Sequence, residues 1–236
     1  MLSAKPIQTE VFKKGMDLES FLLSHLNGRE LEGKILAVTS KLVSVSENRF
    51  VKKSEIEKED LVKREADIYL GRCSYDCHLT IKESLLIPSS GIDESNSEGD
   101  EFILYPENPF ISAKHICEKV KAAFSLKDLG VILTDSHTTP LRRGVSGVAL
   151  AYYGFNGLQD KVGHKDLFDR PLMMTSINVA DALAVAATLV MGEGNECCPL
   201  AILDHPVEFK ILEDNSELHI PLEEDLYHPM ITGSLR

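Results

Sequence analysis

Three acidic residues stand at positions that often hold ligands. Asp135 follows the apolar run 130–134, Asp93 lies in a short loop that begins at Gly91, and Glu193 lies between two glycines just past a long apolar segment. Carboxylates that share a cleft need a cation, because like charges would otherwise raise their pKa values strongly. Oxygen ligands suit Mg²⁺ or Mn²⁺, and these ions often keep phosphate oxygens as further ligands. If folding brings the three side chains together, they predict a divalent-metal site that takes a phosphate-bearing ligand.

Each carboxylate also has a structural interpretation. Asp135 could cap a turn or a helix, Asp93 could form an Asx turn, and Glu193 could be a solvated loop residue after a glycine that ends a helix. The three positions are too far apart in the sequence to form a local motif. The sequence therefore leaves both interpretations open.

Basic and imidazole side chains near Asp135 could complete such a site. Arg142 and Arg143 follow it by seven and eight residues. Arginines can grip phosphate or carboxylate with two parallel hydrogen bonds, and the alternative is a surface ion pair. His137 is a candidate substrate-binding or proton-transfer group, or simply a packed histidine.

Other motifs carry less chemistry. Cys73, Cys77 and His78 are spaced superficially like metal ligands, but no second half of a zinc motif follows. The five cysteines are odd in number and irregularly spaced, which favours reduced thiols over a disulfide framework. Asp181 lies in an apolar segment and is expected to be a buried, hydrogen-bonded carboxylate. Neither a P-loop nor a G-x-S-x-G nucleophile motif is present in the sequence.

The composition narrows the class of protein. The 236 residues include 25 basic and 37 acidic side chains, for a formal charge of −12, and 43% are hydrophobic. An acidic chain without tryptophan is a poor match for nucleic acid or an anionic membrane, so neither partner is expected. The first residues lack the apolar core of a secretory signal, and no apolar run reaches the length of a membrane span. A cytoplasmic location is therefore expected.

Helical and strand patterns are mixed along the chain. Because they do not follow a strict strand–helix–strand order, they favour an α+β fold. We expect helices over residues 17–26, closed by the pair 27–28, and over 54–70, 109–124 and 175–191. We expect strands over residues 34–39, 84–87, 102–105, 130–134, 147–153 and 200–203, with short strands near 208–212 and 219–222.

Eight segments occur in the order found in coenzyme F-420-0:L-glutamate ligases, and together they cover about residues 5 to 205. The segments are Val38-Thr-Ser-Lys41, Asn48-Arg49, Gly91-Ile-Asp-Glu-Ser-Asn96, Leu133-Thr-Asp135, Arg142-Arg-Gly-Val-Ser-Gly147, Gly163-His-Lys-Asp-Leu167, Val179-Ala-Asp181 and Met191-Gly-Glu-Gly194. The chain resembles this family, and looks closest to its branch of folate-metabolism γ-glutamate ligases.

The resemblance implies a GTP-dependent enzyme that attaches L-glutamate to a carboxylate of a folate-like or deazaflavin acceptor. It also implies a single ligase-like unit over residues 1–236, an intertwined homodimer and Mg²⁺ or Mn²⁺, with two divalent ions. The implied metal ligands are Asp93, Asp135, Ser136 and Glu193. The implied nucleotide contacts are Ser40, Lys41, Asn96, Met191, Gly192, Gly194 and Asn195.

Two segments depart from the family pattern. Many relatives carry a nucleotide-contacting lysine at the position of Val45, which bears on the preference for GTP. The family's Asp-Thr-x-Gly-Arg segment is here Asp135-Ser-His-Thr-Thr139. The missing glycine and arginine imply an acceptor other than the F-420 precursor, with folate as a substitute.

Asp135, Arg142, Arg143 and His137 are the predicted catalytic residues. The arginines would clamp phosphate or glutamate, and His137 would be the base. A coenzyme F-420-0:L-glutamate ligase is the first alternative to the folate enzyme. The others are a nucleotide-binding relative without catalysis and a metal-dependent phosphohydrolase.

Overall fold

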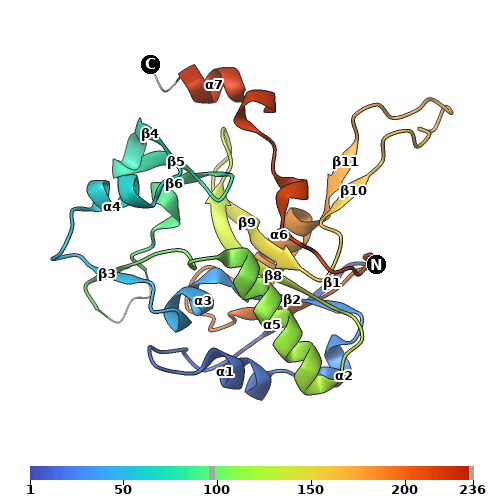
Figure 1. Cartoon of the computed structure of the whole chain (residues 1–236), viewed down its shortest axis with the longest axis horizontal. Coiled ribbons are helices and arrows are strands. Elements are labelled where there is room, and N and C mark those ends of the chain that lie inside the picture. Colours follow the sequence, from blue (N-terminus) through green and yellow to red (C-terminus); the bar gives the residue numbers. More distant parts are fainter. Residues whose placement is uncertain (96–98, 234–236) are drawn as a thin grey trace.

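The computed structural model describes residues 1–95 and 99–233, and its centre is a five-stranded sheet with the strand order β1-β12-β2-β8-β9 (Figure 1). These strands are β1 (Ser3–Ile7), β2 (Lys34–Thr39), β8 (Leu129–Thr138), β9 (Val145–Tyr153) and β12 (Leu200–Asp204). Within this sheet β2 and β8 run parallel, and the other neighbours are antiparallel. The inner strands β2 and β12 and the first half of β8, up to Leu133, are mainly apolar because both faces of the sheet are covered there.

Two long helices cover opposite faces of this sheet. α5 (Pro109–Phe124) begins with Pro109 after the cap residue Asn108, and packs against β8 and β9. α6 (Val179–Met191) is capped by Asn178 and packs on the other face (Figure 1). Their small buried side chains allow a close approach to the strands.

A β-bulge in β9 explains how the two ends of this strand pack against helices on opposite faces of the sheet. Leu133 pairs with Ala151 and Thr134 pairs with Ala149, so Leu150 is an extra residue in β9. Gly147 and Tyr153 would otherwise face the same side of the sheet. Instead Gly147 lies against Ala184 of α6, and Tyr153 contacts the Phe110 ring of α5. A bulge reverses the facing of the residues beyond it.

Smaller elements surround the central sheet. Three short helices lie near its inner strands and α5: α1 (Leu18–His25), α2 (Gly28–Leu31) and α3 (Ser40–Ser46). A separate lobe holds β3 (Phe50–Lys52) paired with β7 (Glu101–Ile103), α4 (Lys58–Glu65), and the sheet of β4 (Ile68–Arg72), β5 (His78–Lys82) and β6 (Leu85–Pro88). This lobe meets the central sheet where Leu150 packs on Ile87 and Tyr105.

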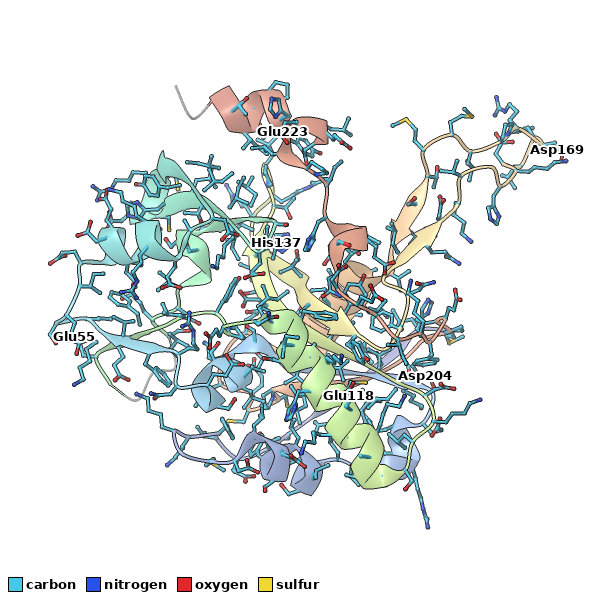
Figure 2. All side chains as sticks on the ribbon, viewed as in Figure 1. Glu55, Glu118, His137, Asp169, Asp204 and Glu223 are labelled. Atoms are coloured by element: carbon cyan, nitrogen blue, oxygen red, sulfur yellow. The ribbon has the colours of Figure 1, made fainter. Side chains whose placement is uncertain are left out.

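Two segments extend from the body of the molecule. An arm formed by β10 (Leu158–Asp160), β11 (Ser176–Asn178) and their connection projects outward, with Asp169 at its tip (Figure 2). The C-terminal segment carries short 3-10 turns at Ser216–Leu218 and Leu222–Glu224 and ends with α7 (His228–Gly233). In the described part of the chain, no helix has the length and apolar character needed to cross a membrane.

The mixed helices and strands in several separate sheets are consistent with the expected α+β class. The strand over 34–39 and the helix over 109–124 are confirmed residue for residue. The strands expected at 84–87, 130–134, 147–153 and 200–203 are confirmed with shifted or longer bounds. The strand expected at 102–105 is displaced, since β7 covers Glu101–Ile103.

Four expectations about the elements are wrong. The helix expected over 54–70 is shorter: α4 covers Lys58–Glu65, the backbone of Ala66 is extended, and the next apolar residues form β4 because they pair with β5. Asn27 begins α2 instead of closing α1, since its side chain accepts the Arg29 N–H. Residues 176–178 form β11 ahead of α6. Segments 208–212 and 219–222 are not strands, and Phe209 makes only an isolated bridge to Phe155.

Candidate functional site

A cavity of about 710 Å³ lies beside the outer half of β8. The parallel pairing with β2 stops at Thr39 and Thr134, while β8 continues to Thr138 paired with β9. Among the described residues, the other edge of β8 is therefore free beyond Thr134, and side chains from both of its faces reach the same space. The cavity is also lined by α3, the loop before β7 and the segment after α6.

Asp135 is the first residue of this free edge. Its pair with Val148 is the second β8–β9 pair beyond the bulge. Asp135 faces the side of α5, while Ser136 faces α6 and Thr188, and both line the cavity. The sequence pattern predicted a strand that stops just before Asp135. In the structure β8 continues through Thr138, because β9 pairs with it that far. β-bulges re-aim side chains and are frequent beside active sites.

The Asp135 carboxylate is held by two hydrogen-bond donors. Tyr105 donates from its hydroxyl to Oδ2 at 2.5 Å, and the Ser136 backbone N–H donates to the carboxylate as well. Burial nevertheless raises the pKa of Asp135 to about 6, because desolvation outweighs these donors, and nearby Asp93 adds repulsion. Burial also raises the pKa of Tyr105 well above its usual value, so its hydroxyl stays a donor.

A glycine makes room for Tyr105. Gly91 has φ +68°, and a Cβ atom there would lie 2.1 Å from Cζ of the tyrosine ring. The left-handed backbone and the close approach both require glycine. Gly91 thereby places the ring so that its hydroxyl reaches Asp135.

Asp93 is neutralised by a lysine. Lys41 Nζ lies 2.5 Å from Oδ2 of Asp93, and the Ser95 N–H donates to Oδ1 at 2.6 Å. Lys41 also donates to the carbonyl and hydroxyl oxygens of Ser95, at 3.3 and 3.2 Å. Burial opposes ionisation of Asp93, but Lys41 and Ser95 together lower the pKa below its usual value. The Asx turn considered for Asp93 is present, and it coexists with a place in the cavity wall.

Glu193 lies in the segment that follows α6, and it lines the same cavity. Gly192 ends the helix with φ +83°, and a Cβ atom on it would lie 2.4 Å from Cδ of Glu196. The Glu196 carboxylate in turn accepts the Gly194 N–H at 2.8 Å. The glycines therefore allow a tight loop whose backbone approaches the cavity.

His137 lies further along β8, where Figure 2 labels it, and it is one of the residues that line the cavity. Its Nδ1 lies 3.2 Å from the carbonyl oxygen of Ser146, which can only accept. A proton on Nδ1 leaves Nε2 as the free acceptor of a neutral ring.

Several predicted nucleotide contacts lie together in the cavity wall. These are Lys41, Met191, Gly192, Gly194 and Asn195. Ser40 is buried and is not part of the wall, and Ser44 donates to its carbonyl oxygen. Asn96 lies outside the described residues.

Arg142 and Arg143 do not line the cavity. They lie in the exposed turn between β8 and β9, four or more residues beyond Thr138. This position gives no support to a clamp on the ligand within one chain, and their catalytic role stays a prediction.

The site includes residues that the sequence patterns do not single out. Tyr105 and Thr188 belong to segments with ordinary strand and helix patterns, and Glu10 precedes the first helix. Glu10 and Thr188 line the cavity, whereas Tyr105 acts behind Asp135. The only local signal for Tyr105 is a buried phenol, which usually needs a hydrogen-bond partner.

The charge of the cavity wall favours a cation. Among its described residues are the carboxylates of Glu10, Asp93, Asp135, Glu193 and Glu196, against one lysine or arginine, Lys41. The oxygen donors suit Mg²⁺ or Mn²⁺. Lys41 already forms an ion pair with one of these carboxylates, Asp93. No three histidine, cysteine, aspartate or glutamate side chains in the described chain are grouped closely enough to hold an ion as they stand.

The fold and the site together define a mixed α/β protein with a carboxylate-rich cavity at the free edge of a central strand. A model of the F420-0:Gamma-glutamyl ligase family matches residues 6–205. The chain therefore belongs to this family, whose members are amide-bond-forming ligases.

Named relatives support the assignment. The chain is 33% identical to the coenzyme F420:L-glutamate ligase of Methanopyrus kandleri, over 72% of this chain and 74% of that protein. It is 32% identical to the coenzyme F420:L-glutamate ligase of Methanothermobacter thermautotrophicus, over 80% and 82%. A match at 40% identity to the enzyme of the same name from Methanococcus maripaludis covers 62% of this chain and 58% of that protein.

Proposed function

We propose that this protein joins L-glutamate to a carboxylate of a deazaflavin acceptor of the coenzyme F420 type, with hydrolysis of GTP. The observation that carries the proposal is that Asp93, Asp135 and Glu193 all line one cavity within the family-matched region. The relatives are named for coenzyme F420, so they favour this acceptor over folate.

A folate-like acceptor is the second candidate. The segment Asp135-Ser-His-Thr-Thr139 lacks the glycine and arginine of the family pattern, and it forms the outer end of β8 beside the cavity. Folate also ends in a glutamyl carboxylate. An assay in which the deazaflavin and folate acceptors compete for the same enzyme distinguishes the two candidate functions.

The proposed reaction activates the acceptor by phosphorylation. A carboxylate is a poor acyl donor, because its leaving group would be oxide. Transfer of the γ-phosphoryl group of GTP to the acceptor carboxylate gives an acyl phosphate and GDP. The glutamate amine then attacks the acyl carbon, the C–O bond to phosphate breaks, and the amine loses a proton.

The chain's own residues have three tasks in this scheme. Asp93, Asp135, Glu193 and Ser136 would hold one or two Mg²⁺ or Mn²⁺ ions, and these ions supply charge neutralisation for the phosphoryl transfer. Lys41 and the Met191–Asn195 segment would hold the nucleotide. His137, through Nε2, would accept the amine proton.

The charge balance supports a metal requirement. A nucleoside triphosphate is strongly anionic, and the described cavity wall offers it five carboxylates and a single lysine. Binding without additional cations would place the phosphates close to like charges, including the buried Asp135 carboxylate.

We also propose that two copies associate through the β10–β11 arm. The arm exposes apolar side chains to solvent, including Leu167 at 98%, Phe168 at 76% and Met174 at 83% exposure. An apolar surface of this kind on a projecting hairpin is typical of an association surface.

Phosphate release and product mass test the function. Purified protein is mixed with GTP, Mn²⁺, L-glutamate and either the deazaflavin precursor or folate. A ligase releases phosphate only when both glutamate and an acceptor are present, and the product gains the mass of one glutamyl residue. Release without glutamate would indicate a phosphohydrolase, and binding of GTP without release would indicate a non-catalytic relative.

A further inference from the structure

Lys41 and Asp93 form an ion pair inside the candidate site, and the pair has a consequence for the order of ligand binding. Lys41 Nζ lies 2.5 Å from Oδ2 of Asp93, and Oδ1 accepts the Ser95 N–H at 2.6 Å. Each oxygen of this carboxylate therefore already contacts one donor. A metal ion at Oδ2 would lie directly against the positive charge of Lys41, so the ion is disfavoured there until Lys41 leaves.

The lysine is held in place by more than one contact. Its ammonium also donates to the carbonyl and hydroxyl oxygens of Ser95. Three acceptors match the three N–H bonds of the ammonium group. The side chains of Lys41 and Asp93 are 29% and 37% exposed, so the pair is partly shielded from water.

No other lysine or arginine in the described cavity wall can compete for an incoming phosphate. A phosphate group would draw Lys41 away from Asp93, because charge-assisted contacts to phosphate are strong. The same movement would free Oδ2 for a divalent ion. Phosphate and metal would thus each favour the arrangement that the other needs.

From this geometry we infer that Lys41 acts as a built-in substitute for the metal, which blocks Asp93 until a phosphate-bearing ligand takes the lysine. The inference rests on the proposed function, since it assumes that Asp93 is a metal ligand. It makes the binding of metal and of nucleotide mutually dependent, and such coupling is reciprocal by thermodynamic necessity.

The test is the affinity for Mn²⁺ alone, measured from the paramagnetic resonance signal of the free ion without nucleotide. Lys41→Met should bind Mn²⁺ about tenfold more tightly than the unmodified protein, the size of effect expected for removing one charge-assisted hydrogen bond. Exposed Lys52→Met is the matched control, because it removes the same charge outside the cavity. It should change the affinity less than twofold. If Lys41→Met does not fold, Lys41→Gln provides the same comparison.

Asp93→Asn separates this inference from the function it rests on. In the variant that combines Lys41→Met with Asp93→Asn, the tenfold gain should disappear. The inference is overturned if Lys41→Met binds Mn²⁺ like the unmodified protein while Asp93→Asn still weakens Mn²⁺ binding in the presence of GTP. If Asp93→Asn leaves Mn²⁺ binding with GTP unchanged, Asp93 is not a ligand and the metal assignment falls together with the inference.

Discussion

The phenol of Tyr105 donates a 2.5 Å hydrogen bond to the carboxylate of Asp135, across thirty residues of sequence. This bond favours the ionised form of a carboxyl whose burial favours the neutral form. Tyr105→Phe keeps the ring and removes the donor, so the pKa of Asp135 should rise further. We expect kcat/KM for the ligase reaction to fall about tenfold near pH 6 and less at pH 8.

The full pH profile checks this prediction, because a purely structural effect would lower activity equally at all pH values. The acid limb of the profile should move to higher pH in Tyr105→Phe. An unchanged limb would show that the phenol does not support the charge on Asp135.

Asp135→Asn should abolish turnover and stabilise the fold. The pKa of Asp135 is raised from the ordinary value to about 6 in the folded chain, so its ionised form is disfavoured by folding. That destabilisation is absent below about pH 4 and is complete above pH 6. Asparagine is never charged and can still accept from Tyr105. At pH 7.5 the variant should therefore be more stable by about 2 kcal/mol, and near pH 4 the difference should vanish.

Urea unfolding at the two pH values measures this difference. A variant that is less stable at pH 7.5 would mean that the carboxylate is well solvated in the folded protein. A variant that keeps full ligase turnover would remove Asp135 from the proposed mechanism.

Gly91→Ala should displace Tyr105. The new Cβ would lie 2.1 Å from the ring, and the backbone has φ +68°. Gly33→Ala is a matched control, since Gly33 has φ +70° and a Cβ atom there would meet nothing within 4 Å. Both variants should lose about 1 kcal/mol from the backbone conformation, and Gly91→Ala should lose a further 1–3 kcal/mol from overpacking. Equal losses in thermal unfolding would contradict the steric role of Gly91.

Asp181 ties α6 to the bulged strand. Its Oδ1 accepts the Ala149 N–H at 2.9 Å, beside the bulge residue Leu150, and its backbone N–H is capped by Asn178. Asp181→Ala should cost about 1–3 kcal/mol, because the Ala149 donor loses its partner. Asp181→Asn retains an acceptor and should cost less. Similar losses for the two variants would show that the charge, and not the hydrogen bond, matters.

The exposed apolar surface of the β10–β11 arm predicts that the protein forms dimers in a concentration-dependent way. Phe168→Glu places a charge on its exposed apolar surface, and sedimentation should show a shift from dimer to monomer. Lys165→Glu, on the same exposed connection, is a charge-changing control outside the apolar set. A monomeric unmodified protein, or a dimer that persists in Phe168→Glu, would contradict the proposed association.

The sequence pattern predicted an element correctly where the spacing of its apolar residues matches the side chains that are buried in the structure. Residues 34–39 and 109–124 are such cases, because an unbroken apolar run and a proline-led amphipathic segment need little tertiary help. Residues 68–70 are the opposite case: they were expected to continue the helix begun at residue 54, but they pair with β5 as part of β4. The short strands expected at 208–212 and 219–222 do not form. Within the described chain, this segment pairs with no strand and makes only the isolated bridge between Phe209 and Phe155.

The sequence alone determined which residues carry the chemistry, because the identity of Asp93, Asp135, Glu193, Lys41 and His137 fixes what they can bind or transfer. Only the tertiary structure decided that Asp93, Asp135 and Glu193 share one cavity wall, that Lys41 already occupies Asp93, and that Arg142 and Arg143 lie outside that wall. The physical reason is that these contacts depend on strand register, on one bulge in β9 and on where β2 stops beside β8. None of these is encoded by spacing along the chain, since each is set by packing between distant segments.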